Sequence, residues 1–133
     1  MSALTPSWTP RILSLLRIVT GYLLLTHGTA KILGFPKVDM FANLQISSIY
    51  GIAGILELVL GALLVIGLFS RFAAFIASGL CAFAYFIGHA SASTVATPIL
   101  NGGETAVLFC FAFLYLAFAG PGPWSIDAGR GKA

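Results

Sequence analysis

The sequence predicts an all-α integral membrane protein, a four-helix bundle with both termini in the cytoplasm. Apolar runs lie at about 12–34, 49–69, 71–90 and 104–119, and a bilayer core of about 30 Å needs about 20 apolar residues per helix. Hydrophobic residues make up 59% of the chain, and charged residues only 8%. The runs are continuously apolar rather than alternating, which excludes a membrane β-barrel and leaves helices. We expect a single membrane domain over residues 1–133.

The basic residues indicate the orientation. If the chain crosses four times, one side receives Arg11, Arg17, Arg71, Arg130 and Lys132, and the other side receives only Lys31 and Lys37. Because cytoplasmic loops carry an excess of Lys and Arg, both termini are expected in the cytoplasm. The net charge of +3 comes from residues scattered along the whole chain, so no nucleic-acid-binding surface is expected.

The first run carries polar and small residues on one helical face. Spacings of three and four residues relate Arg17, Gly21, Leu24, Gly28 and Lys31, with His27 beside them. Gly21 and Gly28 would let a neighbouring backbone approach closely, so this face should point into the bundle. The run is too long for a signal peptide and has no convincing cleavage site, which favours an uncleaved span.

The connections and the later runs are also expected to pack or to lie at the membrane surface. Residues 35–47 have the spacing of a short amphipathic helix in the outer interface. A break at Ser70-Arg71 separates the second run from the third. In the third run a seam of small residues is formed by Ala74, Ala77, Cys81, Ala84 and Gly88.

Ionisable residues within or beside these runs are the candidates for function, because charge at membrane depth usually faces a partner, a cavity or a substrate. At 1.5 Å per residue, His27 and Glu57 lie about 10 to 12 Å below the outer ends of their helices. We expect these two to form a deep pair, with a shallow cluster near the outer boundary. That cluster consists of Lys31, His89 and Glu104.

Structural roles remain open for several of these residues. Glu57 could be a protonated hydrogen-bonding group that serves only packing. Glu104 follows Asn101 by three residues, which is a capping-box pattern at a helix start. Arg17 and Lys31 lie near opposite membrane surfaces and could extend their charges toward water.

No metal or cofactor motif is complete. The two histidines are not at the same level, which argues against haem. Cys81 and Cys110 form neither a Cys-x-x-Cys pair nor a zinc set, so no metal is expected. They lie at similar depth, and we interpret them as small packing residues rather than as a redox couple.

A series of residues extends through all four runs: Leu16-Arg17, Gly21, His27-Gly28, Lys31, Glu57, Gly61, Gly67-Leu68, Arg71, Gly103-Glu104, Gly120-Pro-Gly and Ser125-Ile126-Asp127. This series resembles the DoxX family of small bacterial inner-membrane proteins. The resemblance implies a multi-pass inner-membrane protein. Such proteins are often grouped with the thiosulfate:quinone oxidoreductase subunit DoxD and with accessories of membrane redox complexes. The polar positions of the family correspond to Arg17, His27, Lys31, Glu57, Arg71 and Glu104, with a structural ionic role expected for Arg17 and Arg71.

Two functions fit these observations. One is a redox-associated subunit of a membrane oxidoreductase complex that binds a quinone-like molecule in the outer half of the bundle. His27, Lys31 and Glu57 would then supply hydrogen bonds and a proton route, and a partner protein would supply electrons. The other is a non-catalytic binding or scaffold protein for a lipid or a small apolar ligand, in which buried charges fix the helix register. Whether the chain is itself an enzyme, and whether it forms oligomers, stays open.

Overall fold

In a computed structural model, residues 5–132 are described, and they form helices and connections without any strand. The long helices are α1 (Thr5–Ile32), α2 (Ile49–Ile66), α3 (Ser70–Gly88) and α5 (Glu104–Ala119). The short ones are η1 (Asp39–Phe41), α4 (Pro98–Asn101) and α6 (Ile126–Gly129). Within the described range, three helices (α1, α2 and α3) are long and apolar enough to cross a membrane, whereas α5 has 16 residues. The predicted all-helical class is therefore confirmed.

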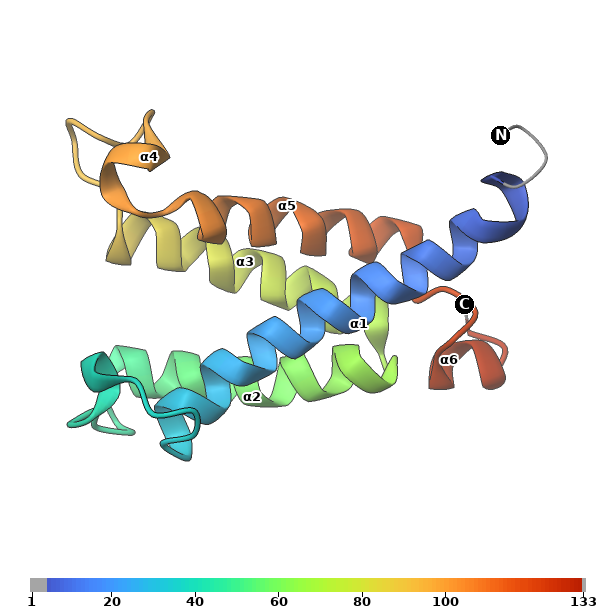
Figure 1. Cartoon of the computed structure of the whole chain (residues 1–133), viewed down its shortest axis with the longest axis horizontal. Coiled ribbons are helices and arrows are strands. Elements are labelled where there is room, and N and C mark those ends of the chain that lie inside the picture. The colour runs from blue at the N-terminus through green and yellow to red at the C-terminus, as the bar shows by residue number, and fades with distance from the viewer. Residues whose placement is uncertain (1–4, 133) are drawn as a thin grey trace.

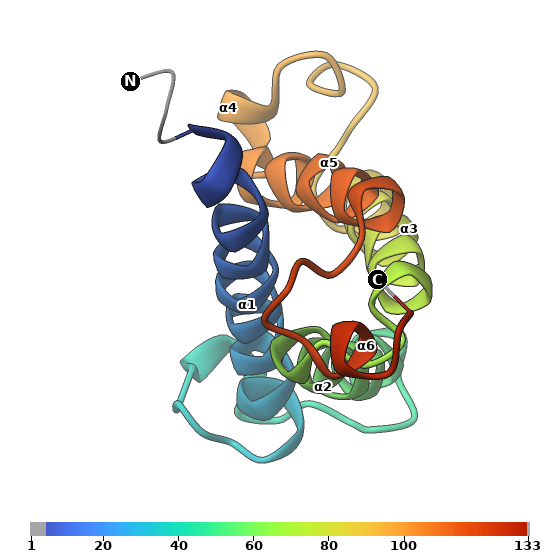
Figure 2. The same ribbon diagram turned by 90° about the vertical axis from the view of Figure 1, so that its right-hand side faces the viewer.

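The long helices pack as two pairs. α1 lies along α2 and α3 lies along α5, with fewer contacts between the pairs (Figures 1 and 2). α1 is oblique and runs from the α5 side toward the α2 side. One end of the molecule carries the connections 33–48 and 89–103, and we call it the long-loop end. The other carries α6 and the α2–α3 turn, and we call it the α6 end.

The core lies where the two pairs meet. It consists of Leu24, Leu60, Leu64, Ala73, Ala74, Ala77, Cys81, Phe113 and Leu116. Large apolar side chains also point outward, including Phe72, Leu108 and Phe118, which are 68%, 72% and 76% exposed. Such faces match the apolar chains of lipid, in which helices associate by close packing rather than by a hydrophobic driving force.

Glycines allow the close approach of α1 and α2. A Cβ atom at Gly28 would lie 2.7 Å from the Cα of Leu58, and one at Gly61 would lie 2.6 Å from the Cα of Leu25. Real side chains do not tolerate such distances to backbone atoms, so these positions require glycine at this spacing. The close approach predicted at Gly28 is therefore confirmed.

The helix boundaries differ in detail from the apolar runs. α2 ends at Ile66, and Gly67 follows with a φ of 74°, a left-handed conformation that glycine adopts without strain. The turn therefore precedes Ser70, which is already helical, rather than falling at Ser70-Arg71. The helix predicted over 35–47 is reduced to the three residues of η1. In α3, the predicted small-residue seam is buried only as far as Cys81, because Ala84 and Gly88 are exposed.

Candidate functional site

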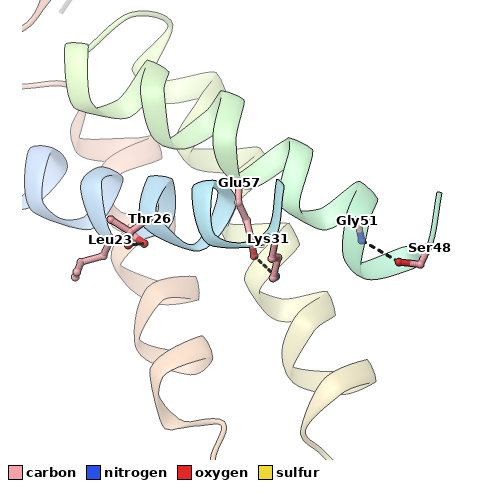
Figure 3. Close-up of polar contacts among 6 residues, drawn as sticks. All are labelled: Leu23, Thr26, Lys31, Ser48, Gly51 and Glu57. Atoms are coloured by element: carbon pink, nitrogen blue, oxygen red, sulfur yellow. Dashed lines mark hydrogen bonds and ion pairs between the residues drawn. The ribbon is translucent and has the colours of Figure 1, made fainter. Parts of the chain in front are cut away.

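An ion pair joins α1 and α2 near the long-loop end. Lys31 lies in the last turn of α1, and its Nζ is 2.9 Å from Oε1 of Glu57 in α2 (Figure 3). The two side chains are only 10% and 11% exposed. Ion pairs exposed to water contribute little to stability. In a pair removed from solvent each ion loses its hydration, so the two charges must lie close together in good hydrogen-bonding geometry.

Local packing holds the Lys31 side chain in place. A Cβ atom at Gly54 of α2 would lie 2.8 Å from the Lys31 Cβ and 3.2 Å from its Cδ, so glycine leaves room for the aliphatic stem. The ammonium group lies 5.4 Å from the centre of the Phe41 ring, in η1. The Lys31 ammonium group therefore interacts both with Glu57 of α2 and with Phe41 of the 33–48 segment.

The Glu57 carboxylate is satisfied on only one side. Oε1 accepts the Lys31 hydrogen bond, whereas Oε2 is buried and has no hydrogen-bond partner among the described residues. The ion pair therefore leaves one buried carboxylate oxygen unmatched in this part of the molecule.

A pocket of about 420 Å³ is lined by Lys31 of this pair, whereas Glu57 is not among its lining residues. Its walls come from the last turn of α1 and from the 33–48 connection, and include Lys31, Leu33, Lys37, Phe41 and Leu44. It therefore combines two cationic side chains with apolar and aromatic surface, which is the usual composition of a small-molecule site.

The expected pair of His27 with Glu57 is wrong. His27 is exposed, and no hydrogen bond or ion pair joins it to another described residue. The depth estimate placed His27 and Glu57 at similar levels in the membrane, but it did not predict in which direction the His27 side chain points. His27 lies beside the buried face of α1, not on it. Helical side chains point toward the N-terminus of their helix, so the long Lys31 side chain reaches back to the depth of Glu57.

The shallow cluster of Lys31, His89 and Glu104 does not form among the described residues. His89 is exposed, and its Nδ1 is 3.2 Å from the carbonyl oxygen of Asn101. Glu104 is exposed, and no hydrogen bond joins it to Asn101. The capping-box alternative is also wrong, because Gly103 precedes α5 without a side-chain cap, and the Asn101 Oδ1 accepts from the Gly103 N–H at 2.8 Å.

A second polar cluster lies at the α6 end, around Arg17. This side chain is completely buried, so it does not extend toward water. Its Nε donates to the Leu64 carbonyl oxygen at 2.8 Å, and its two terminal nitrogens donate to the carbonyl oxygens of Pro121 and Trp124. Carbonyls in the last turn of a helix lack partners within that helix, and the guanidinium supplies one to Leu64.

Asp127 completes this cluster from α6. Its Oδ1 accepts from the Phe69 N–H at 2.9 Å and its Oδ2 from the Ser70 N–H at 2.8 Å, which caps the start of α3. Burial raises the pKa of Asp127, but the hydrogen bonds from Ser70 and Phe69 and the charge of Arg130 outweigh burial and hold the pKa below its usual value. Sequence reasoning did not select Asp127 as a site residue, although it closes the series that resembles DoxX.

Arg71 makes a related contact at the same end. Its guanidinium donates to the carbonyl oxygens of Ala117 and Phe118, in the last turn of α5. Figure 2 shows the segment after α5 crossing this end of the molecule toward α2. Arg17 and Asp127 therefore hold this segment to α1 and to the start of α3, and Arg71 joins α3 to the last turn of α5.

The two cysteines and the potential metal ligands form no redox or metal centre among the described residues. Cys81 and Cys110 are free thiols, and the Ser78 hydroxyl donates to the Cys110 carbonyl oxygen at 2.8 Å. Across residues 5–132, His, Cys, Asp and Glu nowhere gather in a group of three that could hold a metal ion.

The helices and their buried charges define the class: this is an all-helical membrane protein. The family model of DoxX matches residues 12–90, which include Arg17, Lys31 and Glu57. The chain belongs to the DoxX family. It is also 43% identical over 120 residues to an uncharacterized protein of Haemophilus influenzae, and the match covers 89% of this chain and 90% of that relative. No solved structure matches the chain.

Proposed function

We propose that this protein is a multi-pass protein of the bacterial inner membrane that binds a quinone-like molecule as a subunit of a membrane oxidoreductase complex. In this proposal α1, α2, α3 and α5 span the bilayer as a four-helix bundle. The α6 end faces the cytoplasm because Arg11, Arg71 and Arg130 lie there, in agreement with the excess of basic residues on that side. The long-loop end, with its pocket, then lies in the outer half of the membrane.

The observation that carries the proposal is the position of Lys31, which both binds Glu57 and lines the pocket of about 420 Å³. A quinone needs an apolar slot for its ring and donors for its carbonyl oxygens. Leu33, Phe41 and Leu44 offer the apolar surface, and the ammonium groups of Lys31 and Lys37 offer the donors. A membrane-embedded carboxyl such as Glu57 can exchange a proton with the ligand. A partner protein of the complex exchanges the electrons.

Binding of quinone to the purified protein tests this function. The full chain is extracted from native membrane in mild detergent, its lipids are analysed for quinone, and the shift of Tm on adding ubiquinone-1 is measured. We expect bound quinone, a raised Tm and a co-purifying redox protein. The exposed Lys37 lines the pocket, so Lys37→Met should weaken binding several-fold while the fold is kept. Lys132→Met, which removes a cation near the α6 end, is the matched control and should bind normally. Absence of both extracted quinone and a Tm shift would refute the proposal.

A second candidate is a non-catalytic site for a lipid. It is favoured by the position of Lys37 at the pocket rim and by Phe35 and Met40 in the same connection, which are 77% and 83% exposed. Apolar tips of this kind can enter the membrane interface while lysine contacts an anionic headgroup. Binding to nanodiscs that contain phosphatidylglycerol, with no response to ubiquinone-1, would favour this function over the first.

A further inference from the structure

The starting observation is the outer face of α1, which carries polar side chains at membrane depth. Tyr22 is 57% exposed, His27 is also exposed, and no hydrogen bond or ion pair joins either of them to another described residue. α1 ends at Ile32, so at 1.5 Å per residue Tyr22 lies about 15 Å and His27 about 8 Å inside the helix. A polar side chain that faces hydrocarbon without a partner is costly. The two side chains therefore indicate that protein, rather than lipid, covers this face.

The exposed faces of the other long helices lack this feature. On α2 and α3, the exposed polar side chains are Tyr50 and Arg71, and each is the second residue of its helix. α5 exposes polar side chains in its first two residues and at Tyr115, four residues before its end, where tyrosine can reach the membrane interface. Figure 2 shows α1 along one side of the molecule, where no other helix covers its outer face.

The spacing on this outer face is that of a helix that packs against a parallel helix. Val19, Leu23 and Thr26 follow one another at four and three residues, like the central positions of a two-stranded coiled coil. Val19 and Leu23 are 53% and 42% exposed. The Thr26 hydroxyl is satisfied within α1, because it donates to the Leu23 carbonyl oxygen at 2.7 Å (Figure 3). Tyr22 and His27 lie on opposite flanks of this line.

Two copies of α1 would place these flanks against each other. All copies insert into the membrane in the same orientation, so two neighbouring α1 helices are parallel. In a parallel pair with a two-fold axis, a residue on one flank faces the residue five positions further along the partner helix, on its opposite flank. Tyr22 and His27 are five positions apart. A phenol O–H can donate to an imidazole nitrogen, and an imidazole N–H can donate to a phenolic oxygen.

We propose that α1 forms a homodimer interface within the membrane. A second copy of this chain packs against Val19, Leu23 and Thr26, and Tyr22 of each copy forms a hydrogen bond with His27 of the other. The face is complementary to itself, because each flanking pair supplies both a donor and an acceptor and the two-fold axis repeats the pair. The interface requires that α1 spans the bilayer, and it is independent of any ligand at the long-loop end.

Cysteine cross-linking in native membranes tests the identity of the partner. The full chain with Cys81→Ala and Cys110→Ala receives one new cysteine, by Leu23→Cys or Leu56→Cys, and the membranes are oxidised with copper phenanthroline. The two leucines are 42% and 38% exposed. Leu56 is two residues from Gly54, which packs on α1, so it lies on the other side of α2 and is the matched control. We expect a disulfide-linked dimer of this chain from Leu23→Cys and at least tenfold less from Leu56→Cys. Equal yields, or a disulfide from Leu23→Cys to a different protein, would overturn the proposal.

Substitutions with the native cysteines in place test the hydrogen bonds. The dissociation constant of the dimer is measured by energy transfer between labelled copies of the full chain in liposomes. Tyr22→Phe and His27→Phe should each weaken the dimer at least fivefold, and the double variant should be no weaker than either alone, because both changes remove the same bonds. Tyr115→Phe removes the hydroxyl of a tyrosine that is 59% exposed on α5, and this matched control should dimerise normally. Independent, multiplying effects of the two changes would overturn the pairing of Tyr22 with His27. A monomer at every protein density would overturn the interface itself.

Discussion

The two ends of the molecule use buried polar side chains in different ways. At the α6 end, Arg17 donates to three carbonyl oxygens and both carboxylate oxygens of Asp127 accept backbone N–H groups, while the buried Ser70 Oγ has no hydrogen-bond partner among the described residues. At the long-loop end, the Lys31–Glu57 pair leaves Oε2 of Glu57 without a partner and adjoins a pocket. Each end therefore keeps one unpartnered polar atom, but at the α6 end it belongs to a neutral hydroxyl, whereas at the long-loop end it belongs to a carboxylate whose partner Lys31 lines a pocket.

The largest effect is expected from Arg17. Arg17→Leu should lower the free energy of unfolding by about 3 kcal/mol or more, because three buried carbonyl oxygens would each lose their donor. Arg17→Lys should recover only part of this loss, since an ammonium group cannot reproduce the planar fork of the guanidinium. Unfolding in mixed micelles with increasing denaturing detergent measures both variants. Stability equal to that of the wild type in Arg17→Leu would mean that this cluster does not hold the α6 end together.

The ion pair at the long-loop end should respond differently to two substitutions of one residue. Glu57→Leu should lower the free energy of unfolding by about 3 kcal/mol, because it leaves the Lys31 ammonium buried without its counter-ion. Glu57→Gln should cost less, since its amide oxygen can still accept from Lys31. The same unfolding titration compares them. Equal stability of the two variants would show that the hydrogen bond to Lys31 contributes nothing.

The close contact of α1 with α2 lies between the two ends of the molecule. Alanine substitutions at two glycines, one inside this contact and one outside it, test its contribution to stability. Gly28→Ala should lower the free energy of unfolding by about 1–3 kcal/mol, because its Cβ would press on the Leu58 backbone. Gly79→Ala in α3 is the matched control. A Cβ there meets no atom within 4 Å, and alanine favours a helix by about 1 kcal/mol, so no loss of stability is expected. Equal losses in the two variants would exclude the contact at Gly28 as the cause.

Acid should act on the α6 end through Asp127. Because its pKa is lower in the folded protein than in the unfolded chain, the carboxylate contributes stability above its unfolded pKa of about 3.9, and this contribution is lost as the pH falls through the folded pKa. Asp127→Asn should therefore lower the free energy of unfolding at pH 7 by about 1 kcal/mol, as loss of a helix cap does. Its deficit relative to the wild type should shrink below pH 4. Unfolding measured at pH 7 and at pH 3 gives both values, and a deficit unchanged between them would exclude the carboxylate charge as its source.

The sequence predicted the helices and the depth of each charged residue in the bundle better than it predicted which residues form pairs. Apolar length is a property of a local segment, so the all-helical class followed directly. The interior position of Glu57, and a partner for it on the first apolar run, were also predicted correctly. The identity of that partner was not, because it depends on the direction of each side chain, which places Lys31 and not His27 against α2. The cluster of Arg17 and Asp127 joins residues more than a hundred positions apart, and no local pattern relates them.

The smallest effect is expected from the two cysteines, between the ends. Cys81 packs in the core and Cys110 is partly buried. The Ser78 hydroxyl donates to the Cys110 backbone carbonyl, which any side chain at that position retains, and only its weaker 3.5 Å contact with the Cys110 Sγ would be lost. Joint replacement by alanine removes two sulfur atoms and leaves a small void, so the free energy of unfolding should fall by about 1 kcal/mol or less. Binding of ubiquinone-1 should persist. The test is to measure stability, ligand binding and the phenotype of cells that carry only the double variant. If these cells match a deletion strain while the protein is present in the membrane at normal level, the cysteines are not packing residues. The two thiols would then belong to the functional site.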